Sequence, residues 1–172
     1  MTNPIQRVAA LFDQAKVRYA FIGAHAVNVW LEPRITADID VTAEAAAEDL
    51  ECLRGVLGNA GFAVAQEHGG ANPSGPDFIR FASADGVVLE VQIAKTQFQR
   101  EVIRRAVRVP PAILVATAED LIVMKLIANR PKDRADLAGL VAIPHIDWGY
   151  VTRWAHEWGV ADRLEETHHH RK

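Results

Sequence analysis

Apolar and polar residues follow two different periods in the first half of the chain. Asn3 is a good N-cap residue, and the helical spacing of Val8, Phe12 and Ala15 after it predicts an N-terminal helix. Short apolar and β-branched runs, bounded by glycine, proline and other turn residues, predict strands. The predicted strands are residues 19–22, 35–41, 62–66, 78–82 and 87–93. Asp85 and Gly86 form a good hairpin turn between the last two.

Helical signals dominate the second half. An extended stretch over 107–115 is the exception, because Pro110 and Pro111 forbid a helix there. The helices predicted after the first strand are 24–31, 42–57, 117–130, 132–140 and 147–159. This order predicts an α+β fold, with a small mixed sheet carrying helices on one side and a helical C-terminal part. We expect a single domain over 1–172, with the sheet at about 18–95 and the helical part at about 97–165.

The composition fits one globular domain. Of 172 residues, 49% are hydrophobic and 24% charged, and the net charge of -3 argues against a general polyanion binder. The single cysteine, Cys52, excludes an intramolecular disulfide, and no apolar run approaches the roughly 18 residues of a membrane span. We therefore expect a cytoplasmic protein without a membrane partner. The run from Thr167 to Lys172 is expected to be a frayed, solvated tail.

Two acids carry the clearest chemical signal. Asp38 and Asp40 are two residues apart on a predicted strand, so their carboxylates project from one face while Ile39 points to the other. Like charges this close repel each other and need a counter-cation. Two divalent ions meet that need in phosphoryl transfer, and oxygen-only ligands favour Mg²⁺ or Mn²⁺.

Glu90 is the candidate for a third acid. It lies in the middle of an apolar strand, between Leu89 and Val91, where a charge needs a reason. It could ligate a metal or act as a general base on an attacking hydroxyl. The competing interpretation is that Asp38 and Asp40 are ordinary solvated strand charges, since a D-x-D pair alone is common.

Gly23 adds a second signal. It closes an apolar strand and opens a short helix about fifteen residues before Asp38. Glycine allows a backbone to approach phosphate closely, and the N–H groups of the following helix, from Ala24 onward, can bind an anion. In isolation such a glycine would simply be a turn.

Together these motifs resemble a known superfamily. Residues 21–24 (Phe-Ile-Gly-Ala) followed by 34–41 (Arg-Ile-Thr-Ala-Asp-Ile-Asp-Val) are similar to the hydrophobic-Gly-Gly/Ser, short helix and Asp-x-Asp pattern of polymerase-β-superfamily nucleotidyltransferases. The Pro-Arg-x-Thr-x-Asp-x-Asp version resembles the AbiEii-type nucleotidyltransferase toxins. The likeness continues through residues 90–106 and 117–136, so it spans most of the chain from Tyr19 to about Leu140.

The resemblance implies roles and two departures. It implies that Asp38, Asp40 and Glu90 bind Mg²⁺ or Mn²⁺ and carry catalysis. Ala24 replaces the usual Ser or Gly, which removes a hydroxyl contact to phosphate, and Glu90 stands where the family more often has Asp. Gly23 and the helix that begins at Ala24 are expected to hold the triphosphate of an NTP.

Two basic residues are further nucleotide-binding candidates. Lys125 shares a helix face with apolar residues, so it either snorkels to solvent or reaches the triphosphate. Arg34 either neutralises the triphosphate or forms a surface salt bridge. Asp133 and Asp136 share a face of the next helix and are expected to orient Lys125 or Lys132, unless they are simply exposed acids.

The leading hypothesis is an enzyme that moves a nucleoside monophosphate from an NTP to an acceptor hydroxyl or phosphate. The resemblance implies a toxin with an antitoxin partner and tRNA as acceptor. The alternatives are a small-molecule adenylyltransferase that modifies an antibiotic, and a degenerate member that binds nucleotide or a partner protein without turnover.

Overall fold

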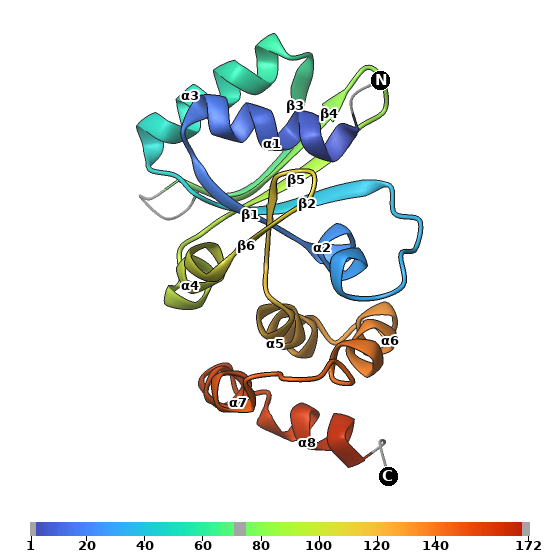
Figure 1. Cartoon of the computed structure of the whole chain (residues 1–172). Helices are drawn as coiled ribbons and strands as arrows, with labels where there is room; N and C mark the ends of the chain where they lie inside the picture. The colour runs from blue at the N-terminus through green and yellow to red at the C-terminus, as the bar shows by residue number, and fades with distance from the viewer. Residues whose placement is uncertain (1–2, 71–74, 170–172) are drawn as a thin grey trace. The chain divides into compact units, whose positions relative to one another are not determined.

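The computed structural model describes residues 3–70 and 75–169 and divides the chain into two compact units (Figure 1). Of the described residues, the first unit contains 3–25, 35–70 and 75–116, and the second contains 26–34 and 117–169. Helix α2 (Gly23–Trp30) begins in the first unit and continues into the second. Among the described residues, no helix is both long enough and apolar enough to cross a membrane.

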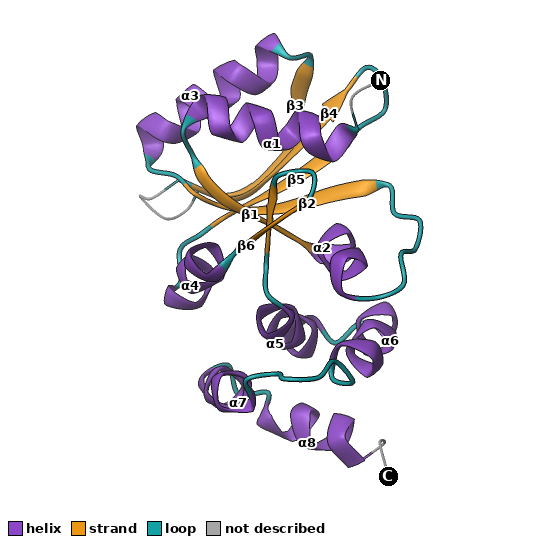
Figure 2. Ribbon diagram, in the orientation of Figure 1, coloured by secondary structure: helices purple, strands orange, loops and turns teal. Residues whose placement is uncertain are grey.

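A mixed sheet forms the frame of the first unit (Figure 2). In the described part of the chain its seven strands lie in the order β3-β4-β5-β2-β1-β7-β6. They are β1 (Arg18–Ile22), β2 (Asp38–Glu44), β3 (Phe62–Gly69), β4 (Pro76–Ser83), β5 (Val88–Ile93), β6 (Val107–Val109) and β7 (Ile113–Val115). β2 runs antiparallel to β1 and parallel to β5. The predicted α+β fold with a mixed sheet is confirmed, and the extended stretch around the two prolines forms the β6–β7 hairpin at its edge.

Helices cover both faces of this sheet, so the expectation of helices on one side is wrong. α1 (Pro4–Ala15) and α3 (Ala47–Asn59) lie on one face, and α4 (Gln97–Arg105) lies on the other (Figure 1). Phe12 of α1 packs on Tyr19 of β1 with ring centroids 4.9 Å apart. The physical reason for the second layer is that α4 has its own apolar stripe, which is buried when the helix packs on β1 and β2.

The helix expected from Thr42 begins later, at Ala47. Residues 42–44 continue β2, because Thr42 pairs with Ala20 of β1 and with Gln92 of β5. A strand position between two neighbours gains ladder hydrogen bonds and burial on both sides. That gain outweighs the helix propensity of the Ala and Glu residues in this segment.

The second unit contains four helices after β7, within the residues that the structure describes. They are α5 (Ala118–Ala128), α6 (Pro131–Leu140), α7 (Trp148–Glu157) and α8 (Ala161–His169). Thr117 and Asp147 cap α5 and α7 as predicted. α8 was not predicted, and residues 167–169 of the expected frayed tail are helical, while 170–172 lie outside the described residues. Leu164 is buried, so α8 continues the apolar packing of this unit.

Candidate functional site

Three carboxylates lie on one face of the first unit's sheet. Asp40 of β2 and Glu90 of β5 are direct register partners on neighbouring parallel strands, and Asp38 is two residues before Asp40. All three side chains are half-buried. Ile39 and Leu89, which alternate with them, are buried on the opposite face. We call Asp38, Asp40 and Glu90 the acid cluster.

Gly23 lies against Asp40. Its φ of +63° is a conformation that residues with a β-carbon rarely adopt. Ile22, the residue before it, is the register partner of Asp40, which places the start of α2 beside the acid cluster. Backbone N–H groups in the first turn of a helix have no intrahelical partner and can bind an anion. Ala24 supplies one of these groups and is half-buried.

A cation already contacts the acid cluster. Nη2 of Arg80 lies 3.3 Å from Oδ2 of Asp38 and 3.2 Å from Oε1 of Glu90. Arg80 is on β4, directly opposite Glu90 in the antiparallel β4–β5 pairing. The sequence interpretation missed this residue. The signal was present, because a hairpin turn over residues 83–86 fixes a register in which Arg80 faces Glu90.

The donor set of the acid cluster fits a hard divalent cation. Carboxylate oxygens are the ligands that Mg²⁺ and Mn²⁺ prefer, and the sheet collects three carboxylates on one face. Among the described residues, however, no three His, Cys, Asp or Glu side chains are already arranged as a metal site. The guanidinium of Arg80 contacts one oxygen each of Asp38 and Glu90. The residues therefore fit a metal by their chemistry, and Arg80 contacts two of them.

Lys125 belongs to the second unit and is almost completely buried there, with 6% of its surface exposed. Its Nζ lies 2.9 Å from Oδ1 of Asp133 and 2.8 Å from Oδ2 of Asp136, both buried carboxylates of α6. The snorkelling alternative is therefore wrong, and the expected orientation by Asp133 and Asp136 is present. Buried charges require such partners, since an uncompensated one is very costly.

Arg34 extends this ion network to the surface of the second unit. Its Nη2 lies 3.0 Å from Oδ2 of Asp136, the oxygen that also contacts Lys125. The Arg34 side chain is 43% exposed, whereas that of Asp136 is 7% exposed. Arg34 thus forms a salt bridge, as one of its two sequence interpretations predicted. Its guanidinium also faces solvent.

The pKa values of the two α6 acids reflect these contacts. Burial alone would raise the pKa of Asp133, but hydrogen bonds from Arg130 and Lys125 lower it to about 2. Burial likewise opposes ionisation of Asp136, and hydrogen bonds from Lys125 and Arg34 keep its pKa below the ordinary value. Both acids are charged at neutral pH, and the network is held together by full charges.

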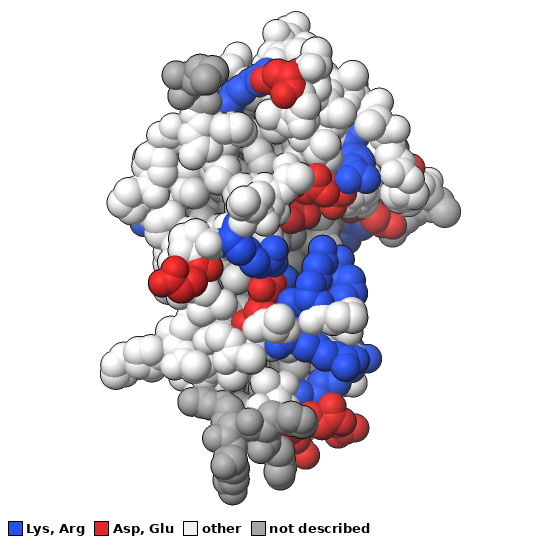
Figure 3. All heavy atoms as spheres, turned by 90° about the vertical axis from the view of Figure 1, so that its right-hand side faces the viewer, with Lys and Arg blue, Asp and Glu red and all other residues white. Residues whose placement is uncertain are grey.

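Exposed cations lie at the start of α6, the helix that carries the two buried acids. Arg130, Lys132 and Arg134 lie at and just after the N-terminus of α6 and are exposed. Figure 3 views the face of the molecule on which several Lys and Arg side chains gather. Because Asp133 and Asp136 point inward, the outer surface of this helix turn is predominantly basic. Such a surface favours an anionic ligand over a cationic one.

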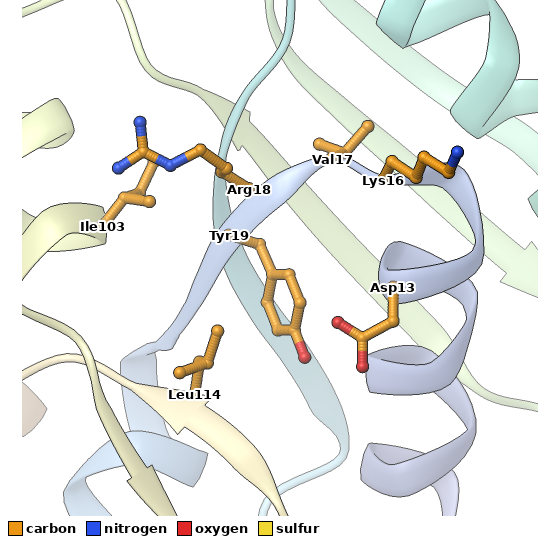
Figure 4. A pocket seen from close by; sticks show the side chains of 7 residues that line it. All are labelled: Asp13, Lys16, Val17, Arg18, Tyr19, Ile103 and Leu114. Carbon is orange, nitrogen blue, oxygen red and sulfur yellow. The ribbon is translucent and has the colours of Figure 1, made fainter.

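A separate cavity of about 280 Å³ lies elsewhere in the first unit, and no member of the acid cluster lines it (Figure 4). The ring of Tyr19 enters it with the hydroxyl directed toward Asp13. Burial, reinforced by the negative charge of Asp13, raises the pKa of Tyr19 to about 12. The phenol therefore stays protonated at all physiological pH values.

His25, at the start of α2, has its pKa lowered by burial.

A family model described as a nucleotidyltransferase of unknown function (DUF6036) matches residues 3–171. The sequence has no match among proteins of curated function.

Solved structures share the fold. The antibiotic-resistance factor ANT(2'')-Ia aligns over 98% of this chain and 96% of its own, at 17% identity and a TM-score of 0.63. The lincosamide antibiotic adenylyltransferase LnuA aligns over 80% and 94%, at 15% identity and a TM-score of 0.58. The Megavirus polyadenylate synthase aligns over 79% of this chain but 30% of its own, at 12% identity and a TM-score of 0.53. At these identities the likeness concerns the fold alone.

Proposed function

This chain belongs to the nucleotidyltransferase family of unknown function DUF6036, and we propose that it transfers a nucleoside monophosphate from an NTP to an acceptor hydroxyl or phosphate. One observation carries the proposal. Asp40 and Glu90 are register partners on parallel strands, Asp38 shares their face, and Gly23 lies against Asp40. This arrangement supplies clustered carboxylates beside backbone N–H donors, which are the two features that a metal-bound triphosphate needs.

In the proposed reaction, an acceptor oxygen attacks the α-phosphorus of the NTP. The new oxygen–phosphorus bond forms while the α–β bridging bond breaks and pyrophosphate leaves. Glu90 accepts the proton of an attacking hydroxyl. Asp38, Asp40 and Glu90 would hold Mg²⁺ or Mn²⁺, which neutralises the triphosphate and stabilises the charge that develops on the leaving group.

The proposed phosphate contacts concern each unit by itself. Within the first unit, we infer that Gly23 and Ala24 offer backbone N–H groups to a phosphate. Within the second unit, the exposed guanidinium of Arg34 stays a sequence-based candidate for an anion contact. Lys125, proposed from the sequence as a direct ligand, is already bound to two carboxylates. Its proposed role is therefore changed to holding Asp136, which in turn orients Arg34.

For the acceptor, we propose an RNA such as tRNA, in the manner of the AbiEii-type toxins that the sequence resembles. The basic surface of α6 supports this choice, because exposed Arg130, Lys132 and Arg134 would attract a phosphodiester backbone. The second candidate is a cationic antibiotic, which the carboxylates of the acid cluster would attract. A toxin role would also imply an antitoxin partner.

The test is nucleotidyl transfer by the purified full chain with Mg²⁺ and each α-labelled NTP. Total tRNA and a panel of aminoglycosides and lincosamides serve as acceptors. We expect label on tRNA from the unmodified chain, and a loss of at least about 100-fold in Asp40→Asn. Asp162→Asn, which removes an exposed acid of α8, is the matched control and should retain activity.

Each alternative has its own outcome. Label on an antibiotic alone would replace RNA by a small-molecule acceptor. Metal-dependent NTP binding without transfer to either class would identify a non-catalytic binding member. Equal transfer by Asp40→Asn and the unmodified chain would overturn the assignment of the acid cluster as the catalytic centre.

A further inference from the structure

Arg80 occupies a position that the proposed transfer reaction does not explain. Its guanidinium bridges Asp38 and Glu90, at 3.3 Å and 3.2 Å, from the strand next to β5. Both carboxylates are ones that the proposed function assigns to the metal. The inference that follows rests on that proposed function and concerns the regulation of the same site.

The position of Arg80 is fixed by the sheet rather than by a flexible loop. Its neighbours Ile79 and Phe81 are 0% and 1% exposed on the opposite face, and they pair with Val91 and Leu89 of β5. A slip of the β4–β5 register would turn these apolar side chains toward solvent. The Cα and Cβ of Arg80 are therefore held beside Glu90 by the strand pairing. Its side chain is 37% exposed, so the guanidinium can change rotamer.

Without a metal, the acid cluster needs this cation. Three half-buried carboxylates on one face of two neighbouring strands repel one another, and Arg80 contacts two of them. When a divalent ion binds the same oxygens, the guanidinium loses these partners. Arg80 and the metal therefore compete, and binding of the metal includes the cost of displacing Arg80.

We propose that Arg80 is a resident counter-ion that competes with the divalent cation for Asp38 and Glu90 and thereby sets the metal affinity of the nucleotide-free site. The displaced guanidinium can then contact an anionic oxygen of the NTP. Arg80 thus makes metal and nucleotide bind cooperatively. It keeps the metal occupancy of the site low when no nucleotide is present.

The experiment measures Mn²⁺ binding to the full chain without nucleotide, from the electron paramagnetic resonance signal of unbound Mn²⁺. We expect Arg80→Gln to bind Mn²⁺ about three- to tenfold more tightly than the unmodified chain, since partly exposed ion pairs contribute modestly. Arg54→Gln is the matched control, because Arg54 lies in the same unit and binds Glu67 at 2.7 Å, away from the acid cluster. Its Mn²⁺ affinity should be unchanged.

A second measurement separates competition from a purely structural role. In EDTA, Arg80→Gln should melt at a lower temperature than the unmodified chain, and saturating Mn²⁺ should remove most of that difference. A deficit of the same size with and without Mn²⁺ would overturn the proposal. If Arg80→Gln does not fold, Arg80→Lys decides. Lysine should contact the two carboxylates less strongly than arginine, so Arg80→Lys should still bind Mn²⁺ more tightly than the unmodified chain. Unchanged or weaker Mn²⁺ binding would overturn the proposal.

The failure of this inference can be told from failure of the proposed function by including Asp40→Ala. If Asp40→Ala loses Mn²⁺ binding while Arg80→Gln binds no tighter than the unmodified chain, the metal site stands and the counter-ion role is wrong. If Asp40→Ala binds Mn²⁺ as the unmodified chain does, the acid cluster is not the metal site and both proposals are overturned.

Discussion

Gly23 and Asp40 are in direct contact: a β-carbon built on residue 23 would lie 2.1 Å from Oδ2 of Asp40. No real β-carbon approaches a carboxylate oxygen so closely, so the contact requires glycine on steric grounds. The φ of +63° at Gly23 requires it independently. The first turn of α2 and the acid cluster are therefore fitted to each other at this one residue.

We predict that Gly23→Ala lowers nucleotidyl transfer by about 100-fold or more, because Asp40 must move away from its position. The strained φ should cost only about 1–2 kcal/mol in the free energy of unfolding. Gly55→Ala is the control, since a β-carbon there meets nothing within 4 Å and the residue lies inside α3. It should be active and slightly more stable. Full activity of Gly23→Ala would show that Asp40 need not occupy its present position.

Lys125→Met should destabilise the chain by about 3–5 kcal/mol in denaturant unfolding, because Asp133 and Asp136 would remain buried without their shared cation. Methionine fills much of the same volume, so the loss of charge rather than of packing is tested. Lys132→Met, an exposed change on α6, should alter the free energy of unfolding by no more than about 0.5 kcal/mol. Similar small effects in both variants would contradict the ion network.

The pKa of Asp133 predicts a pH dependence of stability. Because the pKa in the folded chain, about 2, is below the ordinary value of 3.8, ionised Asp133 stabilises the fold above about pH 4. That contribution is lost as the pH falls from about 4 to 2. Urea unfolding at pH 2–6 should therefore show a shallower loss of stability in Asp133→Asn than in the unmodified chain. Identical slopes would contradict the lowered pKa. Asp162→Asn should keep the original slope.

Tyr150 supports a buried acid in the second unit. Its hydroxyl donates to Oδ1 of Asp120 at 2.5 Å, and the hydroxyl of Thr117 donates to Oδ2 at 2.7 Å. Tyr150→Phe removes one of these donors from a fully buried carboxylate and should cost about 2 kcal/mol in thermal or urea unfolding. Tyr19→Phe is the comparison, because its hydroxyl borders the cavity in Figure 4 and no buried carboxylate of the described residues accepts a hydrogen bond from it, so it should cost less than Tyr150→Phe. The reverse order would contradict this account.

Local chemistry made much of the fold predictable from sequence. The caps at Asn3, Thr117 and Asp147 form as expected, because each depends on a side chain and a backbone group two or three residues away. The alternation around Asp38 and Asp40 placed both on one face for the same local reason. The end of β2 was not predictable in this way, since Thr42 is held in a strand by partners on β1 and β5.

The side-chain partners were harder to predict than the elements. Asp133 and Asp136 were expected to orient Lys125 or Lys132, but the burial of the Lys125 ion pairs depends on how α5 and α6 pack. The contact of Arg80 with the acid cluster was not predicted, because it depends on the register in which β4 pairs with β5. An arginine between Ile79 and Phe81, opposite a glutamate across a predicted hairpin, is a sequence pattern that predicts an ion pair between the two strands.

The order of strands in the sheet has a consequence for how the acid cluster forms during folding. β2 lies beside β5, although α3, β3 and β4 separate them in the sequence. Such a pairing between distant segments is slow to form, because closing the long intervening loop costs entropy before the contacts stabilise the chain. A partly synthesised chain that ends before β5 carries Asp38 and Asp40 but not Glu90 or its parallel partnership. The acid cluster is therefore complete only once β2 and β5 have paired.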